Sequence, residues 1–348
     1  MGALAGGAVA LSLAACTTTS LSGTIAGAGA SSQEAAMNAW VQTFMENNDG
    51  VTVSYDAVGS GGGRTQFIEG GVQFAGTDAA LKADELADAE ERCGGTVIEL
   101  PLYISPIAVI YNLPSVTEQI QMSAATIANV FNNTITQWDD PAIVAENPGV
   151  DLPDMAITPV HRSDDSGTTA NFTDYLEKAS GGAWEFEGDG DWPIAGGQSG
   201  NGTSGVVSVV QSGEGTIGYA DASRAEGLGT VALKVGDAYV PFSPEAAAAV
   251  VDASPAAADA SDTVLTIDLD RTTTAEGAYP LVLVSYSLAC QTYEDETQAD
   301  LVKEFLTYVA SVDGQELVSD PEIAGSSPIS SELRSTVNGV LDTISATA

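Results

Sequence analysis

A nine-residue segment, residues 161–169, combines the side-chain types best suited to bind an anion. It reads His-Arg-Ser-Asp-Asp-Ser-Gly-Thr-Thr and so joins one guanidinium, two carboxylates and several hydroxyls. Apolar residues follow at spacings of three and four, which predicts that a helix begins near Ser166, Gly167 and Thr168. The N–H groups of a helix N-terminus attract anions, and Arg162 can add a bidentate fork suited to a tetrahedral oxyanion. The alternative is that an aspartate or serine here only caps the helix.

Three other loops offer similar chemistry, and each lies between a predicted strand and a predicted helix. Ser31 and Ser32 follow a strand-like run, Ser60 lies within Gly59-Ser60-Gly61-Gly62, and Asp78 follows the strand-like residues 72–75. Glycines allow a backbone to approach a ligand closely. Any one of these loops is a weak signal, but together with residues 161–169 they predict one shared ligand site.

Predicted strands and helices alternate along the first hundred residues. This rhythm indicates an α/β protein with a largely parallel sheet, in which ligands bind at the carboxyl ends of the strands. The predicted strands are 21–25, 51–55 and 72–75, and the predicted helices include 37–45, 123–131, 245–253, 300–310 and 332–344.

Two long apolar stretches predict where the chain passes between two domains. Residues 96–113 contain Pro101 and Pro106, so a buried strand pair with a bend is expected there rather than one helix. Residues 281–286 form a second buried strand. The expected domains are therefore 17–104 together with 281–348, and 105–280.

The charge balance of the 348-residue chain is extreme, with 48 acidic residues against 10 Lys plus Arg and a net charge of −38. Nucleic-acid binding is excluded, because affinity for phosphate backbones comes from Lys and Arg. The same field repels a small anion, so any anion site must use short-range dipoles and one or two local cations. Arg162 is the expected direct cation, whereas Arg64 and His161 are expected to be surface or packing residues.

The first sixteen residues have the character of an export signal. An apolar run ends in Leu13-Ala14-Ala15-Cys16, too short to span a bilayer, and this ending resembles a bacterial lipobox in which Cys16 becomes lipidated. An ordinary signal peptide with an incidental cysteine is the alternative. Export favours pairing of the remaining cysteines, Cys93 and Cys290. With one histidine in the chain and no ligand spacing, no metal site and no cofactor are expected.

The set of loops resembles the periplasmic and surface phosphate-binding proteins of ABC phosphate importers over nearly the whole mature chain. The stretches that carry the resemblance are 27–31, 59–62, 74–78 and 162–168. The family implies a periplasmic-binding-protein type II clam-shell that closes on one dehydrated phosphate. Its pattern implies that the hydroxyls of Ser31, Ser60, Ser166 and Thr168 and the backbone N–H groups of Ser32, Gly167 and Thr168 donate hydrogen bonds to the phosphate. It also implies that Arg162, held in place by Asp164, supplies the cation and that Asp78 accepts a proton from the ligand.

A carboxylate at an anion site makes sense only if the ligand always carries a proton. Phosphate does and sulfate at neutral pH does not, so Asp78 can discriminate between them by ~10⁴-fold or more. The alternative is that Asp78 only caps the next turn.

The sequence thus predicts a monomeric, lipid-anchored extracytoplasmic phosphate receptor that delivers phosphate to the transmembrane subunits of an ABC permease and is not an enzyme. The alternatives are a secreted phosphatase or other phosphoester enzyme, and a surface adhesion or sensing protein.

Overall fold

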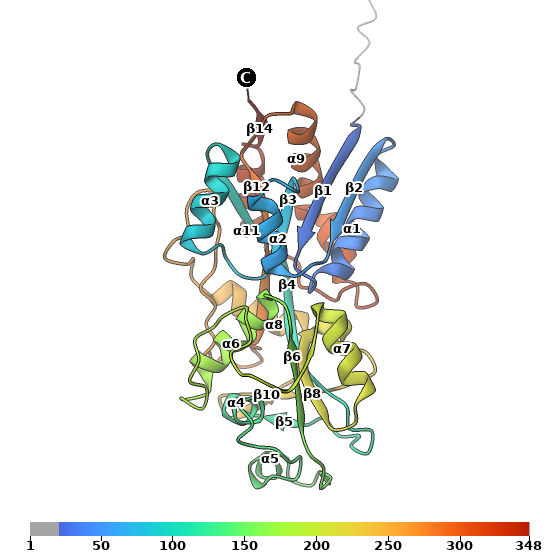
Figure 1. The fold of residues 1–348 in the computed structure, drawn as a ribbon, viewed down its shortest axis with the longest axis vertical. Helices are drawn as coiled ribbons and strands as arrows, with labels where there is room; N and C mark the ends of the chain where they lie inside the picture. Colours follow the sequence, from blue (N-terminus) through green and yellow to red (C-terminus); the bar gives the residue numbers. More distant parts are fainter. Residues whose placement is uncertain (1–20, 348) are drawn as a thin grey trace, which may run out of the picture.

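The computed structural model describes residues 21–347 and shows two lobes stacked along the long axis, with β4 (Val97–Tyr111) running through both (Figure 1). The predicted signal segment 1–16 and its Cys16 lie outside the described residues. The upper lobe contains β1 (Gly23–Gly29), α1 (Glu34–Asn47), β2 (Val51–Asp56), α2 (Ser60–Ile68), β3 (Phe74–Thr77), α3 (Ala83–Cys93), β12 (Val282–Cys290), β13 (Thr292–Tyr293), α9 (Glu296–Ala310), α10 (Val312–Ser319), α11 (Ser331–Leu341) and β14 (Ser345–Ala346).

The lower lobe is formed by the middle of the chain (Figure 1). It contains β5 (Gln121–Met122), α4 (Ala124–Phe131), α5 (Pro141–Glu146), β6 (Thr158–Arg162), α6 (Gly167–Ala179), β7 (Gln198–Gly200), α7 (Gly202–Ser212), β8 (Thr216–Asp221), the 3-10 turn η1 (Ala222–Arg224), β9 (Gly229–Thr230), β10 (Ala232–Val235), β11 (Ala238–Val240) and α8 (Pro244–Ala253). None of the helices in the described part of the chain has the length and apolar character needed to cross a membrane.

One sheet extends through both lobes in the order β2-β1-β3-β12-β4-β8-β6-β7, with β9 also paired to β4. Strands β1, β2 and β3 are parallel, and so are β6, β7 and β8. The prediction of a largely parallel sheet is wrong at its centre, where β12 is antiparallel to β3 and β4, and β4 is antiparallel to β8. The sheet is mixed because its two long central strands run in opposite directions where the chain passes between the lobes.

The predicted strand pair over residues 96–113 is instead the single 15-residue strand β4. Its prolines lie where the ladder is irregular. The pairing with β12 shifts register between Ser285 and Tyr286, opposite Pro101, and Pro106 is the last β4 residue paired with β12 before β8 takes over. Proline lacks a ladder donor and is tolerated at such irregularities. The main-chain N–H of Ile107 then donates to the Leu281 carbonyl at 2.9 Å, which joins the two crossing segments.

The segment between α8 and β12 contacts both lobes. Residues 263–265 pair with Glu99 in the upper half of β4, where the Leu265 N–H donates to the Glu99 carbonyl at 2.8 Å. Downstream, the Tyr279 N–H donates to the Ala246 carbonyl of α8 in the lower lobe at 3.0 Å. We call residues 254–271 the strap, because they pass along the boundary between the lobes before the chain enters β12.

The glycine run after Ser60 forms the first turn of α2 rather than the predicted loop. Glycine is required here by close approach. A Cβ on Gly63 would lie 2.3 Å from the Cα of Gly29, and a Cβ on Gly61 would lie 2.1 Å from the Asp165 carboxylate. The absence of side chains therefore lets α2 pack directly on β1 and on a loop of the lower lobe.

Helix α1 shows how the core supports the upper end of the sheet. Its apolar positions Met37, Trp40 and Phe44 are buried at the predicted helical spacing. Phe44 packs edge-on against Phe305 of α9, with ring centroids 5.3 Å apart. This packing covers β1 and β2, whose carboxyl ends carry the loops of the site.

A disulfide joins Cys93, at the end of α3, to Cys290, at the end of β12. The cysteines are 197 residues apart in sequence, so the bond removes a large amount of chain entropy from the unfolded state. We expect the double substitution Cys93→Ser and Cys290→Ser to lower the free energy of unfolding by roughly 2–5 kcal/mol in urea titrations. Reductant should destabilise the wild type and leave the double variant unchanged; equal urea midpoints for the two proteins would contradict the prediction.

Candidate functional site

The predicted ligand residues gather where the two lobes touch, around the carboxylate of Asp78. Asp78 follows β3 in the upper lobe and is only 3% exposed. The Ser32 hydroxyl lies 2.7 and 2.8 Å from its two carboxylate oxygens, and Thr168 Oγ1 of α6 donates to Oδ2 at 3.1 Å. Loops from both lobes therefore converge on one carboxylate.

Arg162 ends β6 and places a buried guanidinium beside this cluster. Its Nε and Nη2 contact the two oxygens of Asp164 at 2.9 and 2.5 Å, and the Gly202 N–H also donates to Asp164 at 3.0 Å. Burial alone raises the pKa of Asp164, but the hydrogen bonds and charge of Arg162 outweigh it and lower that pKa. Asp164 thus stays ionised and fixes Arg162, whose five N–H donors leave others free for a ligand oxygen.

Helix α6 begins at Gly167, as predicted, and its N-terminus faces Asp78. Ser166 caps it, with its hydroxyl oxygen accepting the Thr169 N–H at 3.2 Å. A Cβ on Gly167 would lie 2.6 Å from the Cβ of Asp78, so only glycine permits this approach between the lobes. Capping and anion binding are compatible readings of this segment, because the serine proton and the first backbone N–H groups remain donors.

Two more serines of the upper lobe, Ser31 and Ser60, place their hydroxyls at the same cluster. Ser60, the first residue of α2, accepts the N–H of Asp78 at 3.1 Å. Ser31 accepts the N–H of Thr203 at 3.0 Å, and the two hydroxyl oxygens lie 3.1 Å apart. Thr203 belongs to the first turn of α7 in the lower lobe, so this contact also crosses between the lobes.

The surroundings of Asp78 set its proton affinity. Burial raises the pKa of the Asp78 carboxyl, while the hydrogen bonds from Ser32 and Thr168 and the charge of Arg162 lower it, leaving a net rise. Its side chain points into the cluster and accepts hydroxyl protons, which does not match the alternative of a cap for the next turn. A carboxylate in this position is an acceptor that a protonated oxyanion can satisfy.

Two expectations about individual residues are corrected. The family pattern implied only a backbone contribution from Ser32, but its hydroxyl binds Asp78 directly. Arg64 was expected at the surface, yet it is 4% exposed and its guanidinium contacts Glu85 at 2.8 Å and Asp165 at 2.9 Å. Asp165 lies in the lower lobe, so Arg64 joins the lobes rather than facing solvent.

Residues outside the prediction also contribute to the cluster. Gly202 and Thr203 hold Asp164 and Ser31, and Asn171 of α6 donates to the Asp78 carbonyl at 2.6 Å. The sequence carried a usable signal only for the first pair, because Asn201-Gly202-Thr203, which begins α7, has the composition of a helix N-terminus. Among residues 21–347, no group of three or more His, Cys, Asp or Glu side chains could hold a metal ion.

Comparison with known proteins gives one consistent result. The model of the PBP superfamily domain matches residues 14–313. The phosphate-binding protein PstS3 of Mycobacterium bovis is 33% identical over 325 residues, which cover 92% of this chain and 86% of that protein.

Two solved structures show the same fold. A high-affinity periplasmic phosphate-binding protein with phosphate bound matches with a TM-score of 0.73 and 20% identity, covering 91% of this chain and 93% of the other. A putative phosphate ABC transporter substrate-binding protein from Clostridium perfringens, also with bound phosphate, matches with a TM-score of 0.62 and 18% identity, covering 87% and 99%.

Proposed function

Because the chain belongs to the PBP superfamily and, within it, to the PstS phosphate-binding proteins, we propose that it binds inorganic phosphate between its lobes and delivers it to an ABC-type permease. The observation that carries the proposal is the convergence of hydroxyls, a helix N-terminus and Arg162 on the buried carboxylate of Asp78. The proposed ligands are Ser31, Ser32, Ser60, Asp78, Arg162, Asp164, Ser166, Gly167 and Thr168, with Asp164 acting through Arg162.

Binding works by hinge closure in this proposal. The moving bodies are residues 17–104 with 281–348, and residues 105–280, and they turn about the crossings near Pro106 and Leu281. Ser31, Ser60 and Asp78 come from one body, whereas Arg162 and the start of α6 come from the other. All ligand contacts therefore exist together only in the closed form, and the ligand stabilises that form by its differential affinity.

The strong negative charge of the chain is compatible with this site. A net charge of −38 repels phosphate at a distance, but the donors act at hydrogen-bond range in a water-poor cleft where their interaction is much stronger. We further propose that Cys16 carries the lipid anchor, that the protein works outside the cytoplasm, and that it is a monomer.

A phosphatase on the same fold finds no support in the site. A serine nucleophile needs an adjacent base. The single histidine, His161, stacks on Trp192 at 5.0 Å, and its two ring nitrogens lie 2.8 and 3.1 Å from the carbonyls of Arg162 and Gly196. The imidazole is thus occupied away from Ser166, whose oxygen caps α6. A turnover assay with a generic phosphomonoester should detect no hydrolysis.

Thermal unfolding tests the proposal directly. A ligand that binds only the folded state stabilises it by about 4 kcal/mol at a thousand times its Kd, so phosphate should raise Tm by several degrees. Sulfate at the same concentration and ionic strength should leave Tm unchanged. Titration calorimetry with both anions provides the affinities. A Tm that does not respond to excess phosphate would refute the proposed function.

A further inference from the structure

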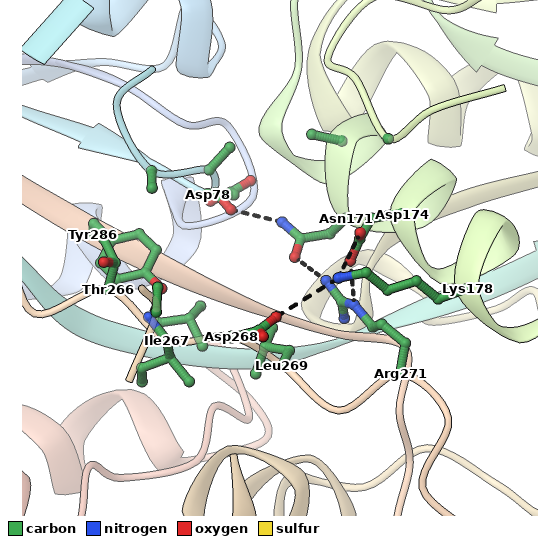
Figure 2. Close-up of a pocket in the computed structure, with 16 residues that line it drawn as sticks. Asp78, Asn171, Asp174, Lys178, Thr266, Ile267, Asp268, Leu269, Arg271 and Tyr286 are labelled. Carbon is green, nitrogen blue, oxygen red and sulfur yellow. Dashed lines mark hydrogen bonds and ion pairs between the residues drawn. The ribbon is translucent and has the colours of Figure 1, made fainter. Parts of the chain in front are cut away.

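Asn171 lies between the ligand cluster and a neighbouring cleft. It lies one turn into α6 and is 7% exposed. The cleft has a volume of about 240 Å³ and is bordered by Asp78, Asn171, Arg271 and Tyr286. Figure 2 shows the carboxamide of Asn171 between Asp78 on one side and Arg271 on the other. Its Nδ2 donates to the main-chain carbonyl of Asp78 at 2.6 Å and to that of Gly167 at 2.9 Å.

Arg271 fixes which way this carboxamide faces. Arg271 belongs to the strap, is 3% exposed, and donates through Nη2 to Asn171 Oδ1 at 2.5 Å. A guanidinium has donors only, so the carboxamide must turn its oxygen toward Arg271 and its nitrogen toward Asp78. If the carboxamide were rotated by half a turn, its N–H₂ group would meet the N–H of Arg271 and its oxygen would meet the carbonyl oxygen of Asp78.

Arg271 is in turn held from three directions. Its Nε contacts Asp174 of α6 at 2.8 Å, and its Nη1 donates to the carbonyls of Pro280 at 3.0 Å and Val282 at 2.6 Å. Pro280 and Val282 lie where the chain enters β12. The guanidinium therefore ties α6 to the crossing segment and holds Asn171 in place from within the lower lobe and the boundary.

We infer that Asn171 is a closure latch, positioned by Arg271, that fastens the lower lobe to the main chain of Asp78 when the lobes are together. The inference rests on the proposed function. The bonds of Asn171 to Gly167 and Arg271 connect parts of one lobe and its boundary, whereas the bond to Asp78 crosses to the other lobe. Opening breaks only the last, so the latch stabilises the closed form alone. It also holds the main chain of Asp78, whose side chain faces the ligand.

The substitution Asn171→Asp removes the amide donor of the latch with almost no change of shape. The new carboxylate still accepts from Arg271, and the pair becomes an ion pair. The nitrogen that donates to the Asp78 and Gly167 carbonyls, however, is replaced by an acceptor. Leaving a buried carbonyl without its donor weakens binding by about 10- to 100-fold in phosphate Kd. The loss should lie mainly in a faster dissociation rate, with the association rate nearly unchanged.

A second variant and a control separate a latch from general support of the fold. Asn171→Ala should weaken phosphate binding by a similar factor. Lys82→Ala removes another contact between the lobes, the 3.1 Å pair with Asp189, but that pair is exposed, so phosphate Kd should change less than about threefold. The Tm of Lys82→Ala without phosphate should stay within about 2 °C of wild type. Each Asn171 variant also loses the 2.9 Å bond to the Gly167 carbonyl inside the lower lobe, so its phosphate-free Tm should fall by a few degrees whether or not the latch exists.

The outcomes are distinguishable. Weaker binding in both Asn171 variants that comes from faster dissociation, with the association rate nearly unchanged, supports the latch. Phosphate Kd values within about threefold of wild type overturn the latch alone and leave the proposed function standing. Weaker binding that comes instead from slower association, with the dissociation rate unchanged, assigns Asn171 to the fold of the lower lobe and also overturns the latch. A wild-type protein that does not bind phosphate in the same titration overturns the proposed function and the latch together.

Discussion

Replacing Arg162 with methionine should weaken phosphate binding by about 10²- to 10⁴-fold, the loss typical of truncating one partner of a buried, hydrogen-bonded charge pair. Arg162 is the guanidinium that β6 directs to the ligand cluster, and Asp164 fixes its Nε and Nη2. Other nearby cations are engaged elsewhere: Arg64 is bound by Glu85 and Asp165, and Arg271 by Asp174. In a chain of net charge −38, no long-range attraction compensates for the missing fork.

Two matched variants separate the role of the fork from that of charge. Lys234→Met removes one positive charge from an exposed position of β10 and should leave phosphate Kd nearly unchanged. The double variant Arg162→Met, Asp164→Asn removes the carboxylate that the single variant leaves without its cation. If the fork itself binds phosphate, the double variant stays weak in titration calorimetry. Recovery to within about tenfold of wild type would show that the single variant lost affinity through the stranded charge of Asp164.

Local signals in the sequence were sufficient for most elements that carry the site. The helices predicted at 123–131 and 245–253 are present, as α4 and α8, with Ser123 and Ser243 as their N-caps. The start of α6 was also correctly predicted at Gly167. These features depend on residues within a few positions of one another, so a short window of sequence contains the information. Hydroxyls and glycines at strand-to-helix junctions could be recognised for the same reason.

Contacts between the lobes could not be predicted in this way. Ser31 meets Thr203 across 172 residues, and Arg64 meets Asp165 across 101. No periodicity encodes such a pairing, so Arg64 looked like an ordinary surface residue. The prediction of a strand pair over residues 96–113 was wrong for a related reason. A single strand β4 tolerates Pro101 and Pro106 because its ladder shifts register at one and changes partner strand after the other. The register shift and the change of partner depend on β12 and β8, which are distant in sequence.

Replacing Asp78 with asparagine should remove the discrimination against sulfate while costing little phosphate affinity. In the wild type, Ser32 and Thr168 donate hydroxyl protons to Asp78, and the lone pairs of the carboxylate that these bonds leave free are acceptors for the ligand. Sulfate at neutral pH brings no proton and meets an unpaired acceptor in a buried site, a mismatch worth ~10⁴-fold or more. Asparagine has nearly the same shape and adds an N–H₂ donor, which can bind an unprotonated oxygen of either anion.

Parallel calorimetric titrations with phosphate and sulfate at one ionic strength test this prediction. We expect the ratio of sulfate to phosphate Kd to fall from ~10⁴ or more to below ~10² in the variant. Asp164→Asn is the matched control, since it neutralises a carboxylate of the same cluster that holds Arg162 and should weaken both anions together. Burial raises the pKa of Asp78, so part of the wild-type population gains a proton as pH falls, and sulfate binding should then rise toward that of the variant. If the Asp78→Asn protein still excludes sulfate as strongly as the wild type, the geometry of the surrounding hydroxyls, and not the carboxylate, selects the ligand.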